Sequence, residues 1–351
     1  MSYIQKPAAY HPALKKNKLG LTRRDYEGTM STLCAGCGHD SITAAIIEAC
    51  FRLELPAHRL AKVSGIGCSS KAPTYFLSRS HGFNSVHGRM PSITTGANLA
   101  NRDLVYLGVS GDGDTASIGL SQFCHAMRRQ LNMTYIVMNN GCYGLTKGQF
   151  SATNDKNSPS KKGEANLFDA IDLAQLAIQL GAGFVARSFS GDKAQLVPLI
   201  EAAISYNGFA FLDVVSPCVT FNNHDQSTKS YGYVRRHNAV LDRLDFVPPE
   251  EEIEIEYDEG TSSEVELHGG ARIRLHKLDV DYDPTDADSA INTIRDRLNK
   301  GEVTTGLLYF DGEEHDLHET LKTSEKPLNE LSMADLCPGS AALDAINQRF
   351  R

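Results

Sequence analysis

Between residues 39 and 225, short apolar runs alternate with longer amphipathic segments, and this alternation limits the folds that the chain can adopt. The apolar runs are rich in Val, Ile, Leu and Tyr, and most of them end in Gly, Ser, Asn or Asp, which is typical of buried strands. Alternating strands and helices predict an α/β fold, in which a parallel twisted sheet carries helices on both faces. The expected strands are Leu60–Ser64, Leu104–Ser110, Met133–Asn139, Gly183–Arg187 and Ala210–Val215. The expected helices are His39–Leu55, Ser92–Asn101, Ser117–Gln130, Asp169–Gly181 and Lys193–Tyr206.

The two ends of the chain differ from this central part. Residues 1–24 contain six Lys and Arg residues and no acidic residue, so we expect an irregular basic arm. Beyond Pro248, apolar and acidic residues alternate, which predicts a small hairpin region rather than more of the parallel sheet. The elements expected after it are a helix at Ala287–Lys300, a strand at Thr305–Phe310 and a helix at Ser340–Arg349. We therefore divide the chain into the arm (1–30), a main domain (31–247) and a small α+β C-terminal appendage (248–351), which we expect to contact another subunit.

Composition and charge exclude several classes of protein. The chain has 351 residues and a net charge of −8, which argues against a general nucleic-acid binder. No apolar run approaches the roughly 20 residues that a membrane span needs, and the N-terminus lacks the apolar stretch of a secretory signal. We therefore expect a cytoplasmic protein without a membrane span. Because the cytoplasm keeps thiols reduced, any grouped members of the eight cysteines are better candidates for metal or cluster ligands than for disulfides.

Two polar motifs follow two of the expected strands. Ser-Gly-Asp-Gly-Asp occupies 110–114, Asn-Asn-Gly-Cys occupies 139–142, and the segment between them has room for one helix and one returning strand. Both motifs should therefore face the crevice at the carboxyl ends of the strands, where glycines let the backbone approach a diphosphate closely. Mg²⁺ prefers hard oxygen ligands, which the Asp112 carboxylate, the Asn140 amide and the Cys142 carbonyl would supply. Each motif alone is ordinarily a turn, but the pair resembles the GDG…NN fingerprint of thiamine-diphosphate enzymes.

Four cysteines lie beside expected strand or helix ends. Cys34 and Cys37 form a C-x-x-C motif before a helix start, whereas Cys68 follows the first strand and Cys218 follows the last. Four thiolates suit tetrahedral zinc or a [4Fe–4S] cluster, and the spacing alone leaves both, as well as no metal, open. The other cysteines are interpreted differently. Cys50 and Cys124 are expected in helices as small core residues, and Cys337 is assigned no role.

Six short motifs occur in a characteristic order: CAGCGH, GIGCSS, VHGR, GDGD, NNGCYGLTKGQ and SPC. Over roughly residues 31–225 they resemble the β subunit, or C-terminal catalytic region, of the 2-oxoacid:ferredoxin oxidoreductases. The resemblance implies bound thiamine diphosphate, Mg²⁺ and one [4Fe–4S] cluster, whose ligands would be Cys34, Cys37, Cys68 and Cys218. Family members usually have Pro where this chain has Ala35, which removes a restraint on φ but no ligand.

The resemblance also implies which residues surround the coenzyme: Ile66, Gly67, Cys68, Ser69, His87, Gly113, Asp114, Gly144 and Leu145. Ser69 and His87 are expected to bond phosphate oxygens or other polar atoms of the coenzyme. Lys71 and Lys147 match family lysines near the reacting centre, where a cation attracts a carboxylate and stabilises developing negative charge. Without the resemblance, a lone histidine in a turn or a surface lysine would be ordinary. The sequence Gly-Leu-Thr-Lys-Gly-Gln around Lys147 is more typical of 2-oxoglutarate members than of pyruvate members.

The implied activity is the coenzyme A-dependent oxidative decarboxylation of a 2-oxoacid, with electrons passing through the cluster to ferredoxin. We rank 2-oxoglutarate first as the substrate, a broad range of 2-oxoacids second and pyruvate third. No glutamate in residues 31–225 lies in a motif that we associate with polarising the aminopyrimidine, so we expect an α subunit and an (αβ)₂ assembly. We also hypothesise that the basic arm helps to dock an acidic ferredoxin through Lys15, Lys16, Lys18, Arg23 and Arg24. The alternative is an ordinary solvated arm or a strap on the α subunit.

Two other functions remain open at this point. One is a non-redox thiamine enzyme, such as a decarboxylase or a synthase, with zinc in the cysteine site. The other is a non-catalytic, zinc-stabilised binding module that keeps the fold and binds no thiamine diphosphate. Colour and EPR after anaerobic reduction distinguish zinc from a cluster, and calorimetry with coenzyme and Mg²⁺ tests the second alternative.

Overall fold

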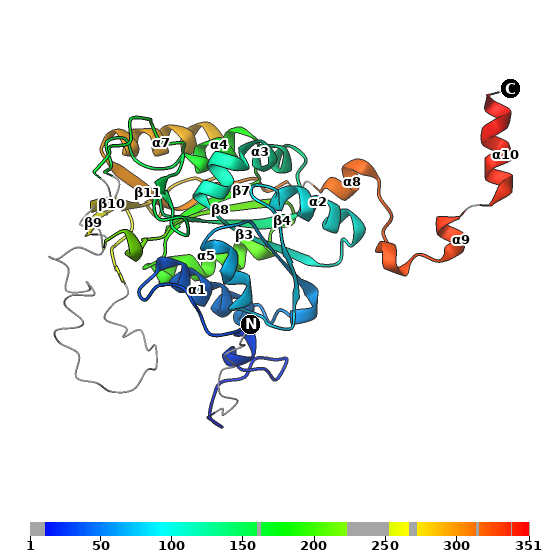
Figure 1. The fold of residues 1–351 in the computed structure, drawn as a ribbon, viewed down its shortest axis with the longest axis horizontal. Coiled ribbons are helices and arrows are strands. Elements are labelled where there is room, and N and C mark those ends of the chain that lie inside the picture. The colour runs from blue at the N-terminus through cyan, green and yellow to red at the C-terminus, as the bar shows by residue number, and fades with distance from the viewer. Residues whose placement is uncertain are drawn as a thin grey trace.

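Within the part of the chain that the structure describes, nine strands form one continuous sheet, with helices on both faces (Figure 1). The computed structural model describes residues 11–159, 163–222, 253–266, 272–313, 316–337 and 339–350. The strand order is β2-β1-β3-β4-β8-β7-β11-β10-β9. The parallel strands are β1 (Leu60–Ser64), β2 (His81–Asn84), β3 (Val105–Gly111), β4 (Met133–Asn139), β7 (Phe184–Phe189) and β8 (Phe209–Val215). The predicted parallel α/β fold is confirmed.

Helices pack on the two faces of this sheet in two layers. On one face lie α2 (Met90–Ala100), α3 (Leu120–Arg128), α4 (Leu173–Gln179) and α7 (Ala287–Asn299) (Figure 1). On the other face lie α1 (Gly38–Arg52) and α5 (Lys193–Ser205). The helices predicted between the parallel strands are all present, with ends that differ by a few residues. The predicted helix at Ser117–Gln130 starts differently, because a wider π-helical turn, η4 (Gly113–Ile118), precedes α3.

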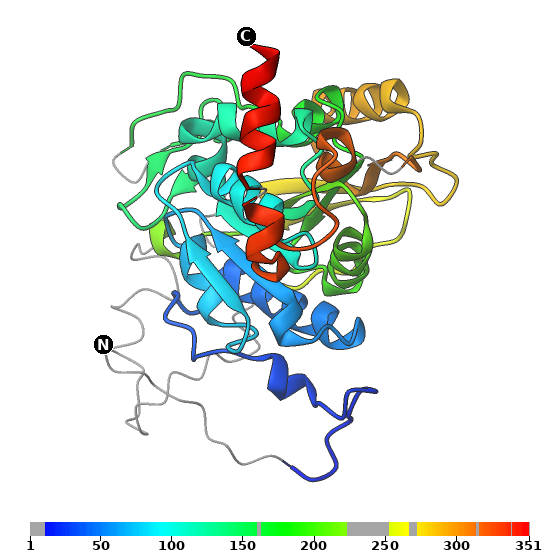
Figure 2. The same cartoon turned by 90° about the vertical axis from the view of Figure 1, so that its right-hand side faces the viewer.

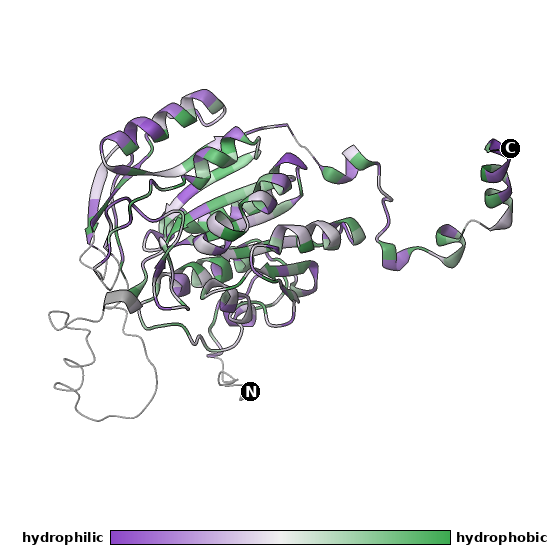
Figure 3. Ribbon diagram, turned by 45° about the horizontal axis from the view of Figure 1, so that its top comes forward, coloured by the Kyte–Doolittle hydropathy of each residue, from purple (hydrophilic) through white to green (hydrophobic). Residues whose placement is uncertain are grey.

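The buried strands contribute side chains to two separate cores, one on each face. In β4, Tyr135 and Val137 join the core under α3, whereas Ile136 and Met138 join the core under α1. The ring of Phe123 on α3 packs edge-on, 5.2 Å from that of Tyr135. A strand that is buried on both faces is apolar at every position, which explains the continuous runs in the sequence. The hydropathy colouring shows these central strands as mainly apolar (Figure 3).

The C-terminal part extends the sheet instead of standing apart from it. The predicted hairpin exists as β9 (Ser262–Glu266) and β10 (Arg272–Lys277), and β10 runs parallel to β11 (Glu302–Phe310). This region is not separate from the main sheet, because β11 pairs antiparallel with β7 and joins all three strands to it. Only one face of the hairpin is buried, so its sequence alternates between apolar and polar residues. This alternation does not indicate which strands of the main sheet lie beside it.

Beyond β11 the chain leaves the sheet as an extended arm (Figures 1 and 2). It carries α8 (Leu317–Leu321), α9 (Met333–Leu336) and α10 (Ser340–Arg349), so the predicted closing helix is present. No helix in the described part of the chain is long and apolar enough to cross a membrane. Two short strands, β5 (Cys142–Tyr143) and β6 (Gln149–Phe150), form a small hairpin after β4.

Candidate cofactor site

The two polar motifs lie side by side at the carboxyl ends of β3 and β4. The Asn140 backbone N–H donates a hydrogen bond to Asp112 Oδ1 at 3.1 Å. The Asn140 side-chain oxygen accepts from the backbone N–H of Cys142, also at 3.1 Å. Parallel pairing of β3 with β4 produces this adjacency, because both strands end at the same edge of the sheet. The structure thus brings together the three residues predicted to hold Mg²⁺.

The Asp112 carboxylate is buried and receives hydrogen bonds from several parts of the chain. Its exposed fraction is 1%. The Ser151 hydroxyl donates to Oδ2, and the Thr153 hydroxyl donates to the same oxygen at 3.1 Å. Burial raises the pKa of Asp112 to about 6, although the bonds from Ser151 and Asn140 oppose this rise. A buried carboxylate is stabilised strongly by a nearby cation, so the site favours a hard metal ion.

A chain of polar groups continues behind Asp112 to a buried arginine. The Thr153 hydroxyl also lies 2.9 Å from Asn139 Oδ1, so its single hydrogen is shared between this oxygen and Asp112. The Asn139 amide donates to Asp213 Oδ1 at 2.9 Å. Arg187 on β7 then donates to Asp213 at 2.9 Å and to Asp172 at 2.6 Å. Burial opposes the charge of Arg187, but the two carboxylates raise its pKa. None of Ser151, Thr153, Asp172, Arg187 or Asp213 was expected at the site from the sequence.

Ser69 has a buried hydroxyl that faces the glycine motif. Ser69 is 1% exposed, and its Oγ has no hydrogen-bond partner in the described part of the chain. A Cβ atom on Gly111 would lie 3.2 Å from this Oγ, so the hydroxyl sits directly against the motif. An unpaired buried hydroxyl costs about 1–3 kcal/mol, which a ligand that accepts its hydrogen would remove. These residues therefore fit a diphosphate.

His87 and Asp114 form a pair beside the same motif. His87 Nδ1 lies 2.6 Å from Asp114 Oδ1, which also accepts the Gly88 backbone N–H at 3.0 Å. The other carboxylate oxygen accepts from Ser110 at 3.0 Å. A Cβ on Gly65 would lie 1.8 Å from this oxygen, so Asp114 fits only because residue 65 is glycine. The Asp114 carboxylate therefore bonds to groups of this chain, and it orients the half-exposed side chain of His87.

The four cysteines predicted as ligands lie in one electrostatically interacting group at this edge. Burial raises the pKa of Cys37 and of Cys68, and both thiols also interact with Cys34 and Cys218. In the part of the chain that the structure describes, no three His, Cys, Asp or Glu side chains converge as ligands of a single metal ion would. A cubane cluster offers a separate iron to each thiolate, so its ligands surround a volume rather than a point. The donor set fits such a cluster.

Two cysteine-bearing segments are tied together by their neighbours in the sequence. His39 at the start of α1 is buried, and its Nδ1 lies 2.6 Å from the Ser216 hydroxyl. The Gly38 N–H donates to the Pro217 carbonyl at 3.2 Å. A Cβ on Gly38 would lie 2.7 Å from the Ser216 Oγ, so this close approach requires glycine. Burial lowers the pKa of His39 to about 4, which keeps its imidazole neutral at physiological pH.

Comparisons with known proteins agree with this geometry. A family model described as the C-terminal TPP-binding domain of thiamine pyrophosphate enzymes matches residues 65–214. The 2-oxoacid:ferredoxin oxidoreductase subunit beta of Sulfolobus sp is 40% identical over 216 residues, which are 61% of this chain and 68% of that subunit. This chain belongs to the 2-oxoacid:ferredoxin oxidoreductase β-subunit family. The 2-oxoglutarate synthase subunit KorB of Methanocaldococcus jannaschii is 36% identical over 212 residues, which are 60% of this chain and 75% of that subunit.

A solved structure extends the likeness to most of the chain. It is described as 2-oxoglutarate:ferredoxin oxidoreductase from Magnetococcus marinus with 2-oxoglutarate, coenzyme A and succinyl-CoA bound. The TM-score is 0.68 at 28% identity, and the match covers 89% of this chain and 94% of that one. The resemblance seen in the motifs is thereby confirmed, and this chain is an oxidoreductase β subunit with a thiamine-diphosphate-binding domain. A β subunit implies an α subunit, and the family name identifies ferredoxin as the redox partner.

The remaining predicted residues of this β subunit lie at two places around the motifs. Ile66 and Gly67 precede Cys68, and Lys71 lies close enough to lower the pKa of Cys68, although burial raises it more. The segment from Gly144 to Lys147 forms the turn of the β5–β6 hairpin, where the Lys147 N–H donates to the Gly144 carbonyl at 3.2 Å. Leu145 and Lys147 are exposed on this turn.

The Lys62 side chain binds the loop that follows Cys68. Its ammonium donates to the carbonyls of Pro73, Phe76 and Leu77 at 2.5, 2.7 and 3.0 Å. These carbonyls belong to the end of η3 (Ser69–Thr74) and to the turn that follows it. Burial lowers the pKa of Lys62 to about 8. The sequence did not reveal this lysine, because it lies inside an expected buried strand.

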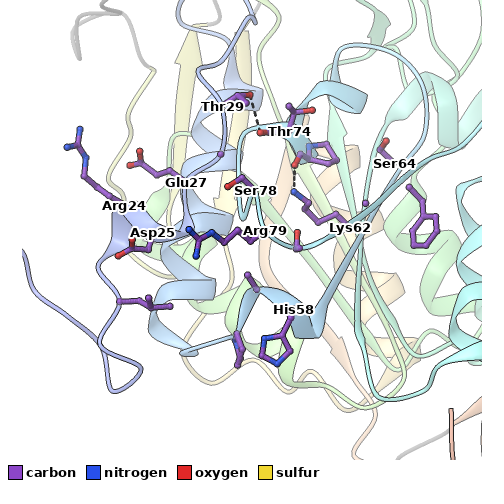
Figure 4. A pocket seen from close by; sticks show the side chains of 18 of the residues that line it. Arg24, Asp25, Glu27, Thr29, His58, Lys62, Ser64, Thr74, Ser78 and Arg79 are labelled. Carbon is purple, nitrogen blue, oxygen red and sulfur yellow. Dashed lines mark hydrogen bonds between the residues drawn. The ribbon is translucent and has the colours of Figure 1, made fainter. Parts of the chain in front are cut away.

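A cleft of about 990 Å³ lies beside the edge strand β2 (Figure 4). Arg24, Lys62 and Arg79 are among its lining residues, and the close-up shows Arg79 between His58 and the loop that carries Thr74. None of the residues predicted to contact the coenzyme or the metals lines this cleft. We therefore do not assign it to the cofactors.

Proposed function

We propose that this chain, together with an α subunit, catalyses the coenzyme A-dependent oxidative decarboxylation of 2-oxoglutarate to succinyl-CoA and CO₂, reversibly. Electrons would pass through one [4Fe–4S] cluster to ferredoxin. The observation that supports this proposal most is the placement of Asp112 and Asn140 at the same sheet edge as four interacting thiols. A coenzyme site beside a cluster site allows a two-electron carbon reaction to feed a one-electron carrier.

The coenzyme would be held by the ends of β3 and β4. Asp112, the Asn140 side chain and the Cys142 carbonyl would bind Mg²⁺, which in turn would bind the diphosphate. Thiamine diphosphate supplies an electron sink for decarboxylation when it is bound. The unpaired Ser69 hydroxyl and the oriented His87 would donate to polar atoms of the coenzyme. The other residues proposed to surround it are Ile66, Gly67, Cys68, Gly113, Asp114, Gly144 and Leu145.

The cluster would be held by Cys34, Cys37, Cys68 and Cys218. A [4Fe–4S] cluster supplies one-electron transfer when it is bound. The chain itself holds the ligand segments in place: the His39–Ser216 contact links the segments of Cys37 and Cys218, and Lys62 binds the loop after Cys68. Four thiolates that each bind one iron suit the cubane cluster that we propose here.

The substrate proposal depends on two lysines. Lys71 lies beside Cys68, and Lys147 lies on the exposed turn of the β5–β6 hairpin. Two cations suit a dicarboxylate such as 2-oxoglutarate, because each would stabilise one carboxylate. The Magnetococcus marinus enzyme is described with 2-oxoglutarate bound, which agrees with this assignment. The Sulfolobus relative is named for 2-oxoacids in general, so a broader substrate range is the second candidate.

The assembly proposed is (αβ)₂, in which the α subunit completes the active site. The experiment is to co-purify both subunits anaerobically and to measure ferredoxin reduction with 2-oxoglutarate, pyruvate and coenzyme A. We expect a cluster EPR signal after reduction and a higher kcat/KM for 2-oxoglutarate than for pyruvate. Zinc in place of iron would overturn the redox assignment, and faster turnover of pyruvate would overturn the substrate assignment.

Lys147→Met tests the substrate assignment more directly. Loss of a charged hydrogen bond to one carboxylate would raise the KM for 2-oxoglutarate by about 10–100-fold and change the KM for pyruvate much less. Lys156→Met is the matched control, because Lys156 is an exposed lysine that pairs with Asp169 at 3.0 Å. Equal changes for both substrates would contradict a role in selecting dicarboxylates.

A further inference from the structure

The cleft beside β2 runs from the amino end of β1 to its carboxyl end. His58 precedes β1, Ser64 ends it, and both line the cleft, which therefore follows this strand for about 16 Å. Ser70 also lines the cleft, and its hydroxyl donates to the Gly67 carbonyl at 2.7 Å. Gly67 belongs to the loop after β1 that is proposed to contact thiamine diphosphate. The cleft therefore reaches the loop of the proposed coenzyme site.

Arg79 supplies this cleft with a cation that the chain does not use. The residue is exposed, and its side chain makes no hydrogen bond or ion pair with any residue that the structure describes. The close-up shows the Arg79 side chain between His58 and the loop that carries Thr74 (Figure 4). A guanidinium binds a phosphate group through two parallel hydrogen bonds. The cleft thus presents a free guanidinium to an anionic ligand.

The two acidic residues among those that line the cleft are bound to other groups of the chain. Asp25 Oδ2 accepts the Thr22 N–H at 2.7 Å and the Thr22 hydroxyl at 2.8 Å. Glu27 Oε1 lies 3.4 Å from Nη1 of Arg23. Neither carboxylate pairs with Arg79 in the described part of the chain. The cations that line the cleft outnumber these two anions: Arg24, Lys62 and Arg79.

We propose that this cleft binds coenzyme A, with its phosphate groups at Arg79 and its thiol directed toward the loop of Gly67. The inference rests on the proposed function, because that reaction needs a thiol that enters from solvent and reaches thiamine diphosphate. Coenzyme A carries its phosphates at one end and its thiol at the end of a long arm. An elongated cleft with a cation along its length and the coenzyme loop at one end matches this arrangement.

The test uses the complete enzyme with its α subunit and compares coenzyme A with pantetheine, a thiol acceptor that has no phosphate. We expect Arg79→Gln to raise the KM for coenzyme A by about 10–100-fold, because a charged hydrogen bond to phosphate is lost, and to leave kcat and the KM for pantetheine nearly unchanged. Arg79→Lys keeps the charge and should recover part of the affinity. Calorimetry with coenzyme A, in the absence of a 2-oxoacid, should show the same loss of binding.

Arg59→Gln is the matched control, because Arg59 is an exposed arginine next to His58 that does not line the cleft. Its KM for coenzyme A should equal that of the wild type, and an increase as large as that of Arg79→Gln would replace the site by a general attraction between charges. An unchanged KM in Arg79→Gln, or equal increases for coenzyme A and pantetheine, would overturn the inference and leave the proposed function intact. A wild-type enzyme that reduces ferredoxin without any need for coenzyme A would overturn the proposed function itself.

Discussion

The coenzyme end and the thiol end of this site are built in different ways. At the coenzyme end, the Asp112 carboxylate accepts hydrogen bonds from Ser151, Thr153 and the Asn140 backbone, and a chain of polar contacts continues to Arg187. At the thiol end, the chain fixes the segments that carry the sulfurs. Burial has the largest effect on the pKa of Cys37 and of Cys68, and a backbone hydrogen bond at His39 opposes it at Cys37. The first end is organised by contacts between its own side chains, whereas at the second the contacts join the backbone segments that carry the sulfurs.

This difference implies that the two ends respond separately to mutation. Binding a metal cofactor supplies folding energy to the segments that carry its ligands, so the thiol end should depend on its cluster for order. The coenzyme end should keep its geometry whether or not the cluster is present.

Removal of a proposed cluster ligand should have the largest effect. Cys218→Ser is expected to abolish the cluster signal and to lower ferredoxin reduction by more than about 100-fold, because a direct ligand matters more than the residues that orient it. Thiamine diphosphate and Mg²⁺ should still bind within a few-fold of the wild-type affinity. Iron analysis, EPR and calorimetry measure these quantities. Cys337→Ser, at an exposed cysteine of the C-terminal arm, is the control.

Retention of a full cluster in Cys218→Ser would remove Cys218 from the ligand set. A parallel loss of coenzyme binding would show that the two ends are not independent, and the comparison would then fail.

Removal of the buried arginine should have the next largest effect, on stability. Arg187→Met leaves the buried Asp213 and the partly buried Asp172 without their cation, which should cost about 3–5 kcal/mol of unfolding free energy. Urea unfolding of the cofactor-free chain measures this loss. Arg272→Met is the matched control, because Arg272 pairs with Glu264 and Glu266 at the surface and should change stability by less than about 1 kcal/mol. Similar losses in the two variants would mean that the network does not organise the coenzyme end.

Substitution of the proposed magnesium ligand should have a smaller and more local effect. Asp112→Asn removes the anionic ligand, and its amide cannot accept all the hydrogen bonds that the carboxylate accepts. We expect the affinity for Mg²⁺ and thiamine diphosphate, measured by calorimetry, to fall by about 10–100-fold, with the iron content unchanged. Asp169→Asn, at an exposed carboxylate, serves as the control. Wild-type affinity in Asp112→Asn would exclude Asp112 as the metal ligand.

The sequence predicts the parallel part of the fold because each buried strand is an apolar run between polar turn residues. The same reasoning places both polar motifs at one edge, since strands that run in parallel end together. It misses β2, whose four residues are exposed and form no apolar run. It also ends the strand β7 at Arg187, whereas the strand continues to Phe189 because Asp172 and Asp213 neutralise the arginine.

The residues that support the site are harder to predict than the residues that face it. Ser151 and Thr153 belong to a loop in which hydroxyl residues are common, so nothing in the pattern connects them with Asp112. Their role depends on how the β5–β6 hairpin returns the chain to the sheet edge, which is a matter of tertiary structure. Lys62 is similar, because its partners are backbone carbonyls that any sequence provides.

Lys62 also offers the smallest of these effects, a test of how the thiol end is held. Because burial lowers the pKa of Lys62 to about 8 in the folded chain, the unfolded chain binds more protons between about pH 8 and 10.5. The free energy of unfolding should therefore rise with pH in this range, by about 1–2 kcal/mol between pH 7.5 and 9.5. Lys62→Met should lack this rise, whereas Lys156→Met, at an exposed lysine, should keep it. The measurement is urea unfolding of the three proteins at both pH values. If Lys62→Met keeps the wild-type slope, the charge of Lys62 is not what binds the three carbonyls, and the loop that carries Cys68 must be held by other contacts.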